Sequence, residues 1–137
     1  MQSVRFRVDL NDRCSIGPGK IELLEAIART GSIRQAALAI NMSYRQAWLL
    51  VDSLNRSFTE PSTTSSVGGA GGGGVELTAF GADLVRRYRV AGRRIETLAR
   101  SEFAALAQKA VAATAAKPAR PRRRLPKPAN GSRRRDV

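Results

Sequence analysis

Histidine is absent from this 137-residue sequence, and cysteine occurs only once, at Cys14. A Ser-His-Asp triad, a Cys-His dyad and a zinc site built from Cys and His each need more of these residues than the chain has. A single cysteine also excludes an intramolecular disulfide and favours a reducing compartment. We expect Cys14 to be a small apolar core residue, no metal to be bound, and an enzyme to be the least favoured class of function.

Long apolar runs are also missing. The N-terminus lacks the apolar stretch of about 7–15 residues that marks a secretory signal, and no run of about 18 apolar residues could span a membrane. The sequence therefore predicts a cytoplasmic protein without a membrane partner.

Positive charge is in excess, with 24 Lys and Arg against 11 Asp and Glu, a net charge of +13. Residues 117–137 hold nine of the basic residues, four prolines and one aspartate. This composition prevents a packed core and predicts a disordered basic tail over residues 114–137. A polyanion such as DNA is the expected partner, to which the tail would add sequence-independent affinity.

Three helical runs with two short breaks occupy residues 19–55. Apolar residues recur at helical spacing, and the breaks fall at residues 30–31 and 41–42. Ser32 and Ser43 follow the breaks and are good N-caps. A short helix, a tight turn and a second helix form a helix-turn-helix, in which the second helix lies in the DNA major groove.

The third run has two contrasting faces. Its apolar residues at core spacing are Ala47, Leu50, Val51, Leu54 and Phe58. Tyr44, Arg45 and Trp48 fall on the other face, where exposed aromatics are hard to explain in a monomer. On a recognition helix, Arg45 could pair with guanine or a phosphate, Tyr44 with a phosphate, and Trp48 with sugar or a thymine methyl. The alternative is that Trp48 packs against the following hairpin or another helix.

Residues 59–77 are rich in turn-forming residues, with six glycines between positions 68 and 74. They could form a flexible linker, or a β-hairpin in which residues 62–67 and 75–77 flank a glycine tip. The hairpin is favoured because a further helix follows at once, and a hairpin after a helix-turn-helix is a wing. The run lacks the Gly-Lys-Ser/Thr ending of a phosphate-binding loop, so nucleotide binding is not expected.

Two further segments are expected to pack. Residues 4–10 alternate apolar and polar side chains, which predicts a half-buried strand. Residues 78–113 predict one helix, roughly 54 Å long at 1.5 Å per residue. Its apolar positions follow a near-3.5 repeat typical of a coiled coil, so we expect a second copy of the chain to cover it, with fraying of the last turns as the alternative.

Four motifs closely resemble the N-terminal DNA-binding domain of the ModE family, bacterial molybdate-responsive transcription regulators that are related in this domain to LysR-type regulators. They are Met42-Ser43-Tyr44-Arg45-x-Ala47-Trp48, Val51-Asp52-x-Leu54-Asn55, the glycine run from Gly68 to Gly74, and Leu77-Thr78-x-Phe80-Gly81. The resemblance covers about residues 17 to 92. It implies a winged helix-turn-helix, a homodimer, palindromic operators and, for a bacterial protein, association with the nucleoid when DNA is bound.

The family's full-length members continue with two small β-barrel domains that bind molybdate. Residues 93–137 predict a helix and a basic tail instead, with no β-rich segment. Molybdate binding by this chain alone is therefore not expected, and no cofactor is predicted.

These features predict a mainly α fold with a small β-hairpin, in which residues 1–113 form a winged helix-turn-helix with a wing at about 61–77 and a dimerisation helix at about 78–113. The expected function is a sequence-specific, homodimeric, DNA-binding transcriptional regulator. Two alternatives are a non-specific, nucleoid-type DNA-binding protein that uses the basic tail, and an oxyanion-responsive regulator. The oxyanion site would lie at the dimer interface, on Arg86, Arg87, Arg93 or Arg94.

Candidate site residues follow from this assignment. The major-groove contacts are assigned to Ser43, Tyr44, Arg45, Gln46 and Trp48. The phosphate contacts are assigned to Arg34 at the start of the second run and to Thr63, Thr64 and Ser65 of the wing. The dimer contacts are assigned to Phe80, Leu84, Tyr88, Ala91, Ile95 and Leu98.

Deleting residues 117–137 is expected to flatten the salt dependence of DNA binding. Each phosphate that a Lys or Arg neutralises contributes about 0.9 to the slope of log affinity against log salt concentration. Titrations of DNA with the full-length and shortened chains at several salt concentrations would measure this slope. An unchanged slope would mean that the tail does not touch DNA.

Overall fold

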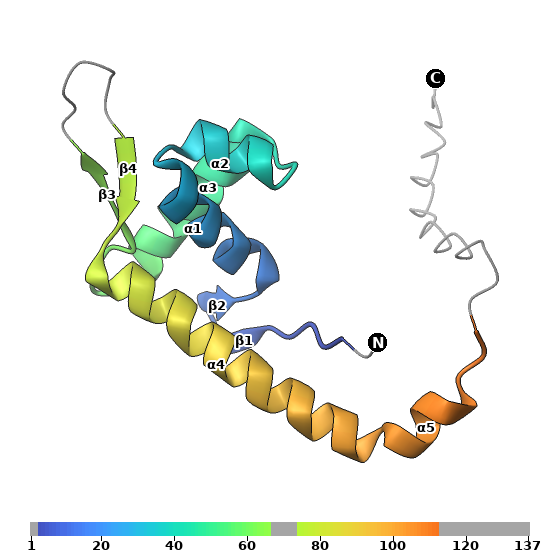
Figure 1. Cartoon of the computed structure of the whole chain (residues 1–137). Helices are drawn as coiled ribbons and strands as arrows, with labels where there is room; N and C mark the ends of the chain where they lie inside the picture. Colours follow the sequence, from blue (N-terminus) through green and yellow to red (C-terminus); the bar gives the residue numbers. More distant parts are fainter. Residues whose placement is uncertain (1–2, 67–73, 113–137) are drawn as a thin grey trace, which may run out of the picture.

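The computed structural model describes residues 3–66 and 74–112, and in this part a three-helix unit carries a β-hairpin on one side and lies along a long helix (Figure 1). In chain order the elements are β1 Val8–Asn11, β2 Cys14–Ile16, α1 Pro18–Thr30, α2 Ile33–Ala39, α3 Tyr44–Ser57, β3 Thr63–Ser66, β4 Gly74–Leu77, α4 Ala79–Glu102 and α5 Ala104–Lys109. None of the described helices is both long and apolar enough to cross a membrane. The expected wing tip and basic tail lie outside the described residues.

The helix-turn-helix forms at the predicted breaks. Gly31 ends α1 in a left-handed conformation, with φ of 74°, which glycine adopts at no steric cost. The Ser32 hydroxyl then accepts a hydrogen bond from the Gln35 N–H at 2.9 Å. In the same way the Ser43 hydroxyl accepts the Gln46 N–H at 3.1 Å. Both serines are therefore N-caps, as predicted, and each satisfies a donor that the helix start leaves without a partner.

Two adjoining apolar clusters form the core. The first joins α1, α2 and α3 through Leu23, Ala26, Ile27, Ala36, Ala37, Ala47 and Val51. The second joins α1, α3, β2 and α4 through Ile16, Ile21, Leu24, Leu54, Leu84 and Tyr88. The small side chains of Ala36 and Ala37 let α1 and α3 pack closely against α2. Cys14 is buried as a free thiol, in agreement with its expected role as an apolar core residue.

The segment after α3 is a hairpin and not a linker. Strands β3 and β4 are antiparallel, with Thr63 opposite Leu77 and Ser65 opposite Val75. Val75 and Leu77 pack against the core. The Val75 N–H also donates to the Gly31 carbonyl at 2.8 Å, which ties β4 to the turn between α1 and α2. The wing is therefore anchored along the helix-turn-helix itself.

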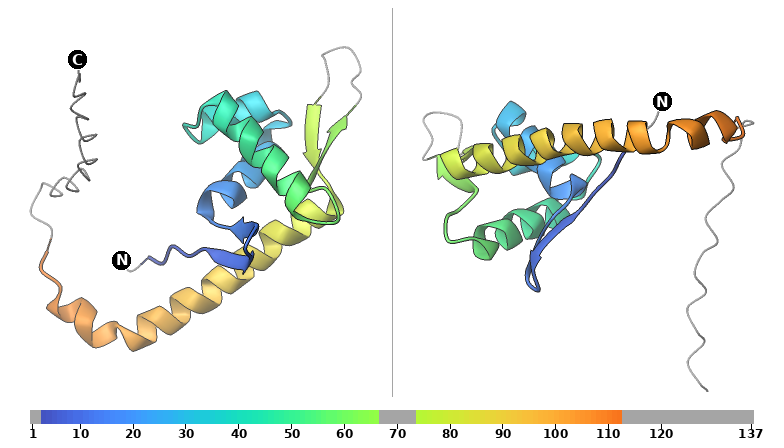
Figure 2. Two further views of the ribbon diagram at one scale, coloured as in Figure 1. Left: turned by 180° about the vertical axis from the view of Figure 1, so that it is seen from behind. Right: turned by 90° about the horizontal axis from the view of Figure 1, so that it is seen from below.

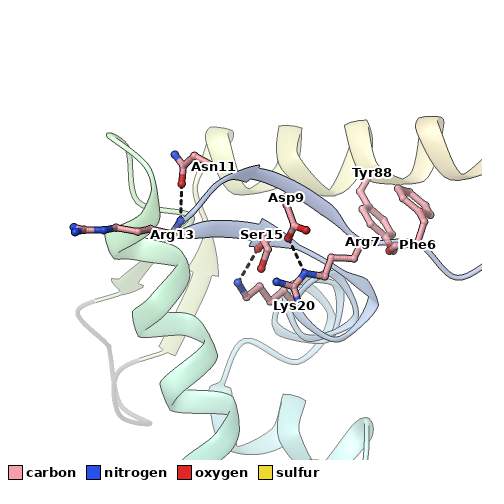
Figure 3. A network of polar contacts seen from close by, with 8 residues as sticks. All are labelled: Phe6, Arg7, Asp9, Asn11, Arg13, Ser15, Lys20 and Tyr88. Carbon is pink, nitrogen blue, oxygen red and sulfur yellow. Dashed lines mark hydrogen bonds and ion pairs between the residues drawn. The ribbon is translucent and has the colours of Figure 1, made fainter.

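The N-terminal segment is less regular than its alternating pattern predicts. Only β1 is a strand, paired with β2 through Val8 and Ile16, whereas residues 3–7 are extended without a ladder partner. Phe6 stacks on Tyr88 with ring centroids 4.3 Å apart, and the Tyr88 hydroxyl donates to the Phe6 carbonyl at 2.7 Å (Figure 3). The segment is thus held by α4 in place of a neighbouring strand. Leu10, expected on a buried face, is 54% exposed.

The long helix ends earlier than predicted. Helix α4 stops at Glu102, and Phe103, with ψ of 9°, separates it from the short α5. Its 24 residues give a length of about 36 Å, and its far end extends beyond the three-helix unit (Figure 2). The physical reason is a loss of packing, because Leu98, Phe103 and Leu106 are exposed and helix stability in proteins comes mainly from a packed apolar face.

Helix α4 crosses the base of the wing in close contact at Gly81. A Cβ atom at this position would lie 2.0 Å from the carbonyl oxygen of Ser62, so only glycine fits without movement of the backbone. By contrast, a Cβ at Gly19 in α1 would meet nothing within 4 Å.

Gly81→Ala is expected to lower the free energy of unfolding by about 3 kcal/mol, the upper part of the usual cost of overpacking a tight site. Gly19→Ala is the matched control and should raise it by about 0.5 kcal/mol, because alanine is the better helix former. Urea unfolding followed by circular dichroism would measure both. Equal stability of the two variants would show that the crossing relaxes readily.

Candidate nucleic-acid interface

Helix α3 presents one apolar face to the core and a contrasting face to solvent. Ala47, Val51 and Leu54 are buried. Tyr44 and Trp48 are 49% and 48% exposed, and Arg45 between them is exposed as well. Burial of the first face therefore leaves two aromatic rings and a guanidinium together in water, at the N-terminal end of the helix.

The start of α2 adjoins this face. The guanidinium carbon of Arg34 lies 5.0 Å from the centroid of the Tyr44 ring, a cation–π distance. The contact orients both side chains, and the edge of the guanidinium can still donate hydrogen bonds. Five of the predicted residues are thus exposed around one helix start: Arg34, Ser43, Tyr44, Arg45 and Gln46.

Trp48 does not follow the alternative prediction of packing against the wing or another helix, because half of its surface stays exposed within the protomer. Leu49 beside it is 49% exposed, and Leu38 on α2 is also exposed. Neither leucine was among the candidate residues. The helical spacing places Leu49 on the solvent face of α3, so its position was available from the sequence, whereas Leu38 has no comparable signal.

The wing residues divide between two environments. Thr63 is 7% exposed, and its hydroxyl accepts a hydrogen bond from the Asn55 side-chain amide at 3.1 Å. Its side chain is therefore turned into the domain, which corrects its assignment to a phosphate. Thr64 and Ser65 are exposed, as that assignment requires. Glu76 lies opposite Thr64 and places a carboxylate on that side of the hairpin, where it would repel a phosphate.

The predicted dimer residues of α4 are partly used within the protomer. Leu84 and Tyr88 belong to the core, and Phe80 packs against Phe58 with ring centroids 5.1 Å apart. Burial raises the pKa of the Tyr88 hydroxyl. Ala91 and Ile95 are half-buried, and Leu98 is 61% exposed. Leu84 and Tyr88 are thus mainly core residues of the protomer, which corrects their assignment as free dimer contacts, whereas pairing of the rest of the repeat with a second copy stays a prediction.

A groove remains open beside this stripe, between β1 and α4. Its volume is about 330 Å³, and its lining is almost wholly apolar. The apolar residues that line it are Phe6, Val8, Leu10, Ile16, Phe58, Phe80, Leu84, Tyr88 and Ala91. We call this feature the β1–α4 groove.

Two of the four α4 arginines predicted as alternatives for an oxyanion site, Arg86 and Arg87, already form ion pairs within the protomer. Asp83 accepts hydrogen bonds from Arg87 at 2.6 Å and Arg86 at 2.5 Å. The hydrogen bond from Arg87, and to a lesser extent that from Arg86, lowers the pKa of the Asp83 carboxyl. The hydrogen bond between Arg87 and Asp83 also raises the pKa of Arg87. Arg93 and Arg94 are exposed beside Val90 and Thr97 on an open surface.

A separate ion pair joins Arg89 of α4 to Glu25 of α1, and its hydrogen bond raises the pKa of Arg89. It ties the long helix to the helix-turn-helix. Among residues 3–66 and 74–112, no three His, Cys, Asp or Glu side chains come together in a way that could hold a metal ion.

No family model matches the chain. Curated relatives nevertheless resemble it over more than half of its length. It is 39% identical over 85 residues to the "Molybdenum transport protein ModE" of Azotobacter vinelandii, 38% identical over 85 residues to the "Transcriptional regulator ModE" of Yersinia pestis, and 35% identical over 85 residues to the "DNA-binding transcriptional dual regulator ModE" of Escherichia coli K12. Each match covers 62% of this chain.

These matches confirm the resemblance to ModE proteins that the four motifs indicate. The chain spans about a third of the length of these relatives, 32% in each case. The similarity therefore concerns one region that they share with this chain.

Proposed function

We propose that this chain is a sequence-specific DNA-binding transcriptional regulator that acts as a homodimer and reads its operator with α3. The observation that carries the proposal is the exposed face of Tyr44, Arg45 and Trp48 at the start of the second helix of a helix-turn-helix. The names of the relatives from Yersinia pestis and Escherichia coli support it, since both are transcriptional regulators.

In the proposed complex the N-terminal half of α3 enters the major groove. Arg45 pairs with the edge of a guanine, for which its forked donors are suited. Tyr44 and Arg34, held together by their cation–π contact, reach a phosphate at the side of the groove. Trp48 and Leu49 contact sugars or thymine methyl groups. Ser65, on the face of the wing that adjoins the helices, reaches the sugar-phosphate backbone of the DNA.

Dimerisation would use the β1–α4 groove and the exposed far half of α4. The apolar side chains of Val8, Leu10 and Leu98 are exposed in the protomer, and a second copy would remove them from water. A two-fold arrangement would then present two α3 helices to successive major grooves, about one helical turn apart. A palindromic operator follows from that symmetry.

Two further functions remain as alternatives. The net charge of +13 favours non-specific DNA compaction, in which binding would coat DNA uniformly and leave no footprint of defined length. An oxyanion-responsive regulator is less favoured, because Arg86 and Arg87 already share Asp83 as a partner. We also propose that the regulated process concerns molybdenum, on the strength of the name of the relative from Azotobacter vinelandii.

Arg45→Ala is expected to weaken binding to an operator selected from random DNA by about 10- to 100-fold, since a bidentate arginine–guanine pair contributes about 1–3 kcal/mol of discrimination. Binding to random DNA should change little. Fluorescence anisotropy with both DNAs at one salt concentration would measure the ratio.

Arg56→Ala is the matched control. Arg56 lies at the other end of α3 and is paired with Asp52, so its loss removes the same charge from the same helix. Arg45 would be only a phosphate contact if its variant lost affinity for operator and random DNA in equal measure. A wild-type chain that shows no preference for any selected DNA would overturn the proposed function.

Leu10→Glu and Leu98→Glu are each expected to raise the dimer dissociation constant by more than about tenfold, because a dimer would bury an unpaired carboxylate. Sedimentation velocity at micromolar concentrations would measure it. Leu38→Glu is the control, since Leu38 is also exposed but lies on α2 outside the groove. Unchanged dimers in both test variants would exclude this interface, and a monomeric wild-type chain would exclude the dimer.

A further inference from the structure

The side chain of Asn55, near the end of α3, holds the chain segment that leads into the wing. Its amide oxygen accepts hydrogen bonds from the Ser62 N–H at 2.9 Å and the Thr63 N–H at 3.3 Å. Its amide nitrogen donates to the Thr63 hydroxyl at 3.1 Å. One side chain of the recognition helix thus makes three contacts with the first residues of the hairpin.

Thr78, the N-cap of α4, holds the same segment from the other side. Its N–H donates to the Ser62 carbonyl at 3.0 Å, and its hydroxyl donates to the Pro61 carbonyl at 2.6 Å. The same hydroxyl accepts the Gly81 N–H at 3.0 Å. The segment is therefore fixed between the end of α3 and the start of α4. We call Asn55, residues 61–63, Thr78 and Gly81 the wing-base clamp.

The clamp is closely packed around Ser62. Ser62 is completely buried, and the backbone of Gly81 lies so near its carbonyl that no Cβ fits between them. The hydrogen bonds of Asn55 are partly buried, so water can replace a lost partner there only in part. The direction in which the hairpin leaves the domain is consequently well defined.

We propose that the wing-base clamp sets the position of the wing relative to α3, so that both can contact one DNA site at the same time. Asn55, Thr78 and Gly81 are then positioning residues for DNA recognition, although none of them touches DNA. The inference rests on the proposed function. Its physical basis is preorganisation, because a wing that must first be ordered adds an entropic cost to every binding event.

A charge placed on the wing can report its position. Ser65→Arg suits this purpose because Ser65 is exposed and lies opposite Val75, on the face of the hairpin that adjoins the helix-turn-helix. In the otherwise wild-type chain we expect it to steepen the slope of log affinity against log salt by about 1, the effect of one added phosphate contact. Fluorescence anisotropy with the selected operator would measure the slope.

The same substitution is then tested with the clamp opened. In Asn55→Ala, Ser65→Arg should give a clearly smaller added slope, because only the contacts of Val75 and Leu77 in β4 still hold the wing. Operator affinity should fall about tenfold from lost preorganisation. Asn55→Asp should restore both, because a carboxylate still accepts the two N–H groups and the Thr63 hydroxyl can donate to it. Thr78→Val, which keeps the shape but removes the hydroxyl, should behave like Asn55→Ala and serves if that variant does not fold.

Ser62→Ala is the matched control within the clamp. The Ser62 hydroxyl is buried without a hydrogen-bond partner in the described part of the chain, so its removal leaves every contact of the clamp in place. Thermal unfolding of each variant would confirm that it is folded at the assay temperature.

The results distinguish failure of the clamp inference from failure of the proposed function. Added slope in the wild-type background and a clearly smaller one with the clamp opened would support the inference. Equal added slope in both backgrounds would overturn it, as would no added slope in either, since the wing would then be away from DNA. A wild-type chain without operator preference would instead overturn the proposed function itself.

Discussion

The rotation of α3 about its own axis is the constraint on which the candidate interface depends. Successive residues of a helix are turned by about 100°, so burial of Ala47, Val51 and Leu54 determines the direction of every other side chain. Arg45 and Trp48 then face solvent, and no change of rotamer alone could exchange them with the core residues. The same packing that stabilises the domain therefore also presents the residues proposed to read DNA.

This constraint extends to α4 through Leu54. Leu54 belongs to the cluster that contains Leu84 and Tyr88, so α3 and α4 share one core. Full burial of a leucine side chain contributes about 1.5–3 kcal/mol, far more than exposed ion pairs such as that between Arg86 and Asp83. The relative placement of α3 and α4 is thus determined by apolar packing. The wing-base clamp then fixes the direction in which the hairpin between them leaves the domain.

Local signals made much of the fold predictable. The breaks after α1 and α2, the serine caps and the hairpin each depend on residues close together in the chain, and all were found where expected. The errors arose where distant segments compete. Thr63 has no local feature that separates it from Thr64, and only its contact with Asn55 across the clamp turns it inward. The candidate residues of α3 were placed correctly on its exposed face because one stripe pattern determines both faces.

The apolar repeat of α4 illustrates why its predicted role as a dimer contact differed in part from the structure. A spacing near 3.5 states that a helix has one apolar face, but it does not state which partner covers that face. Leu84 and Tyr88 pack with residues of α1, α3 and the N-terminal segment, and Phe80 packs on Phe58, whereas Leu98 is exposed. One helix thus has a first half packed into the core of the protomer and a far half that is covered only in part, where Leu98 remains exposed.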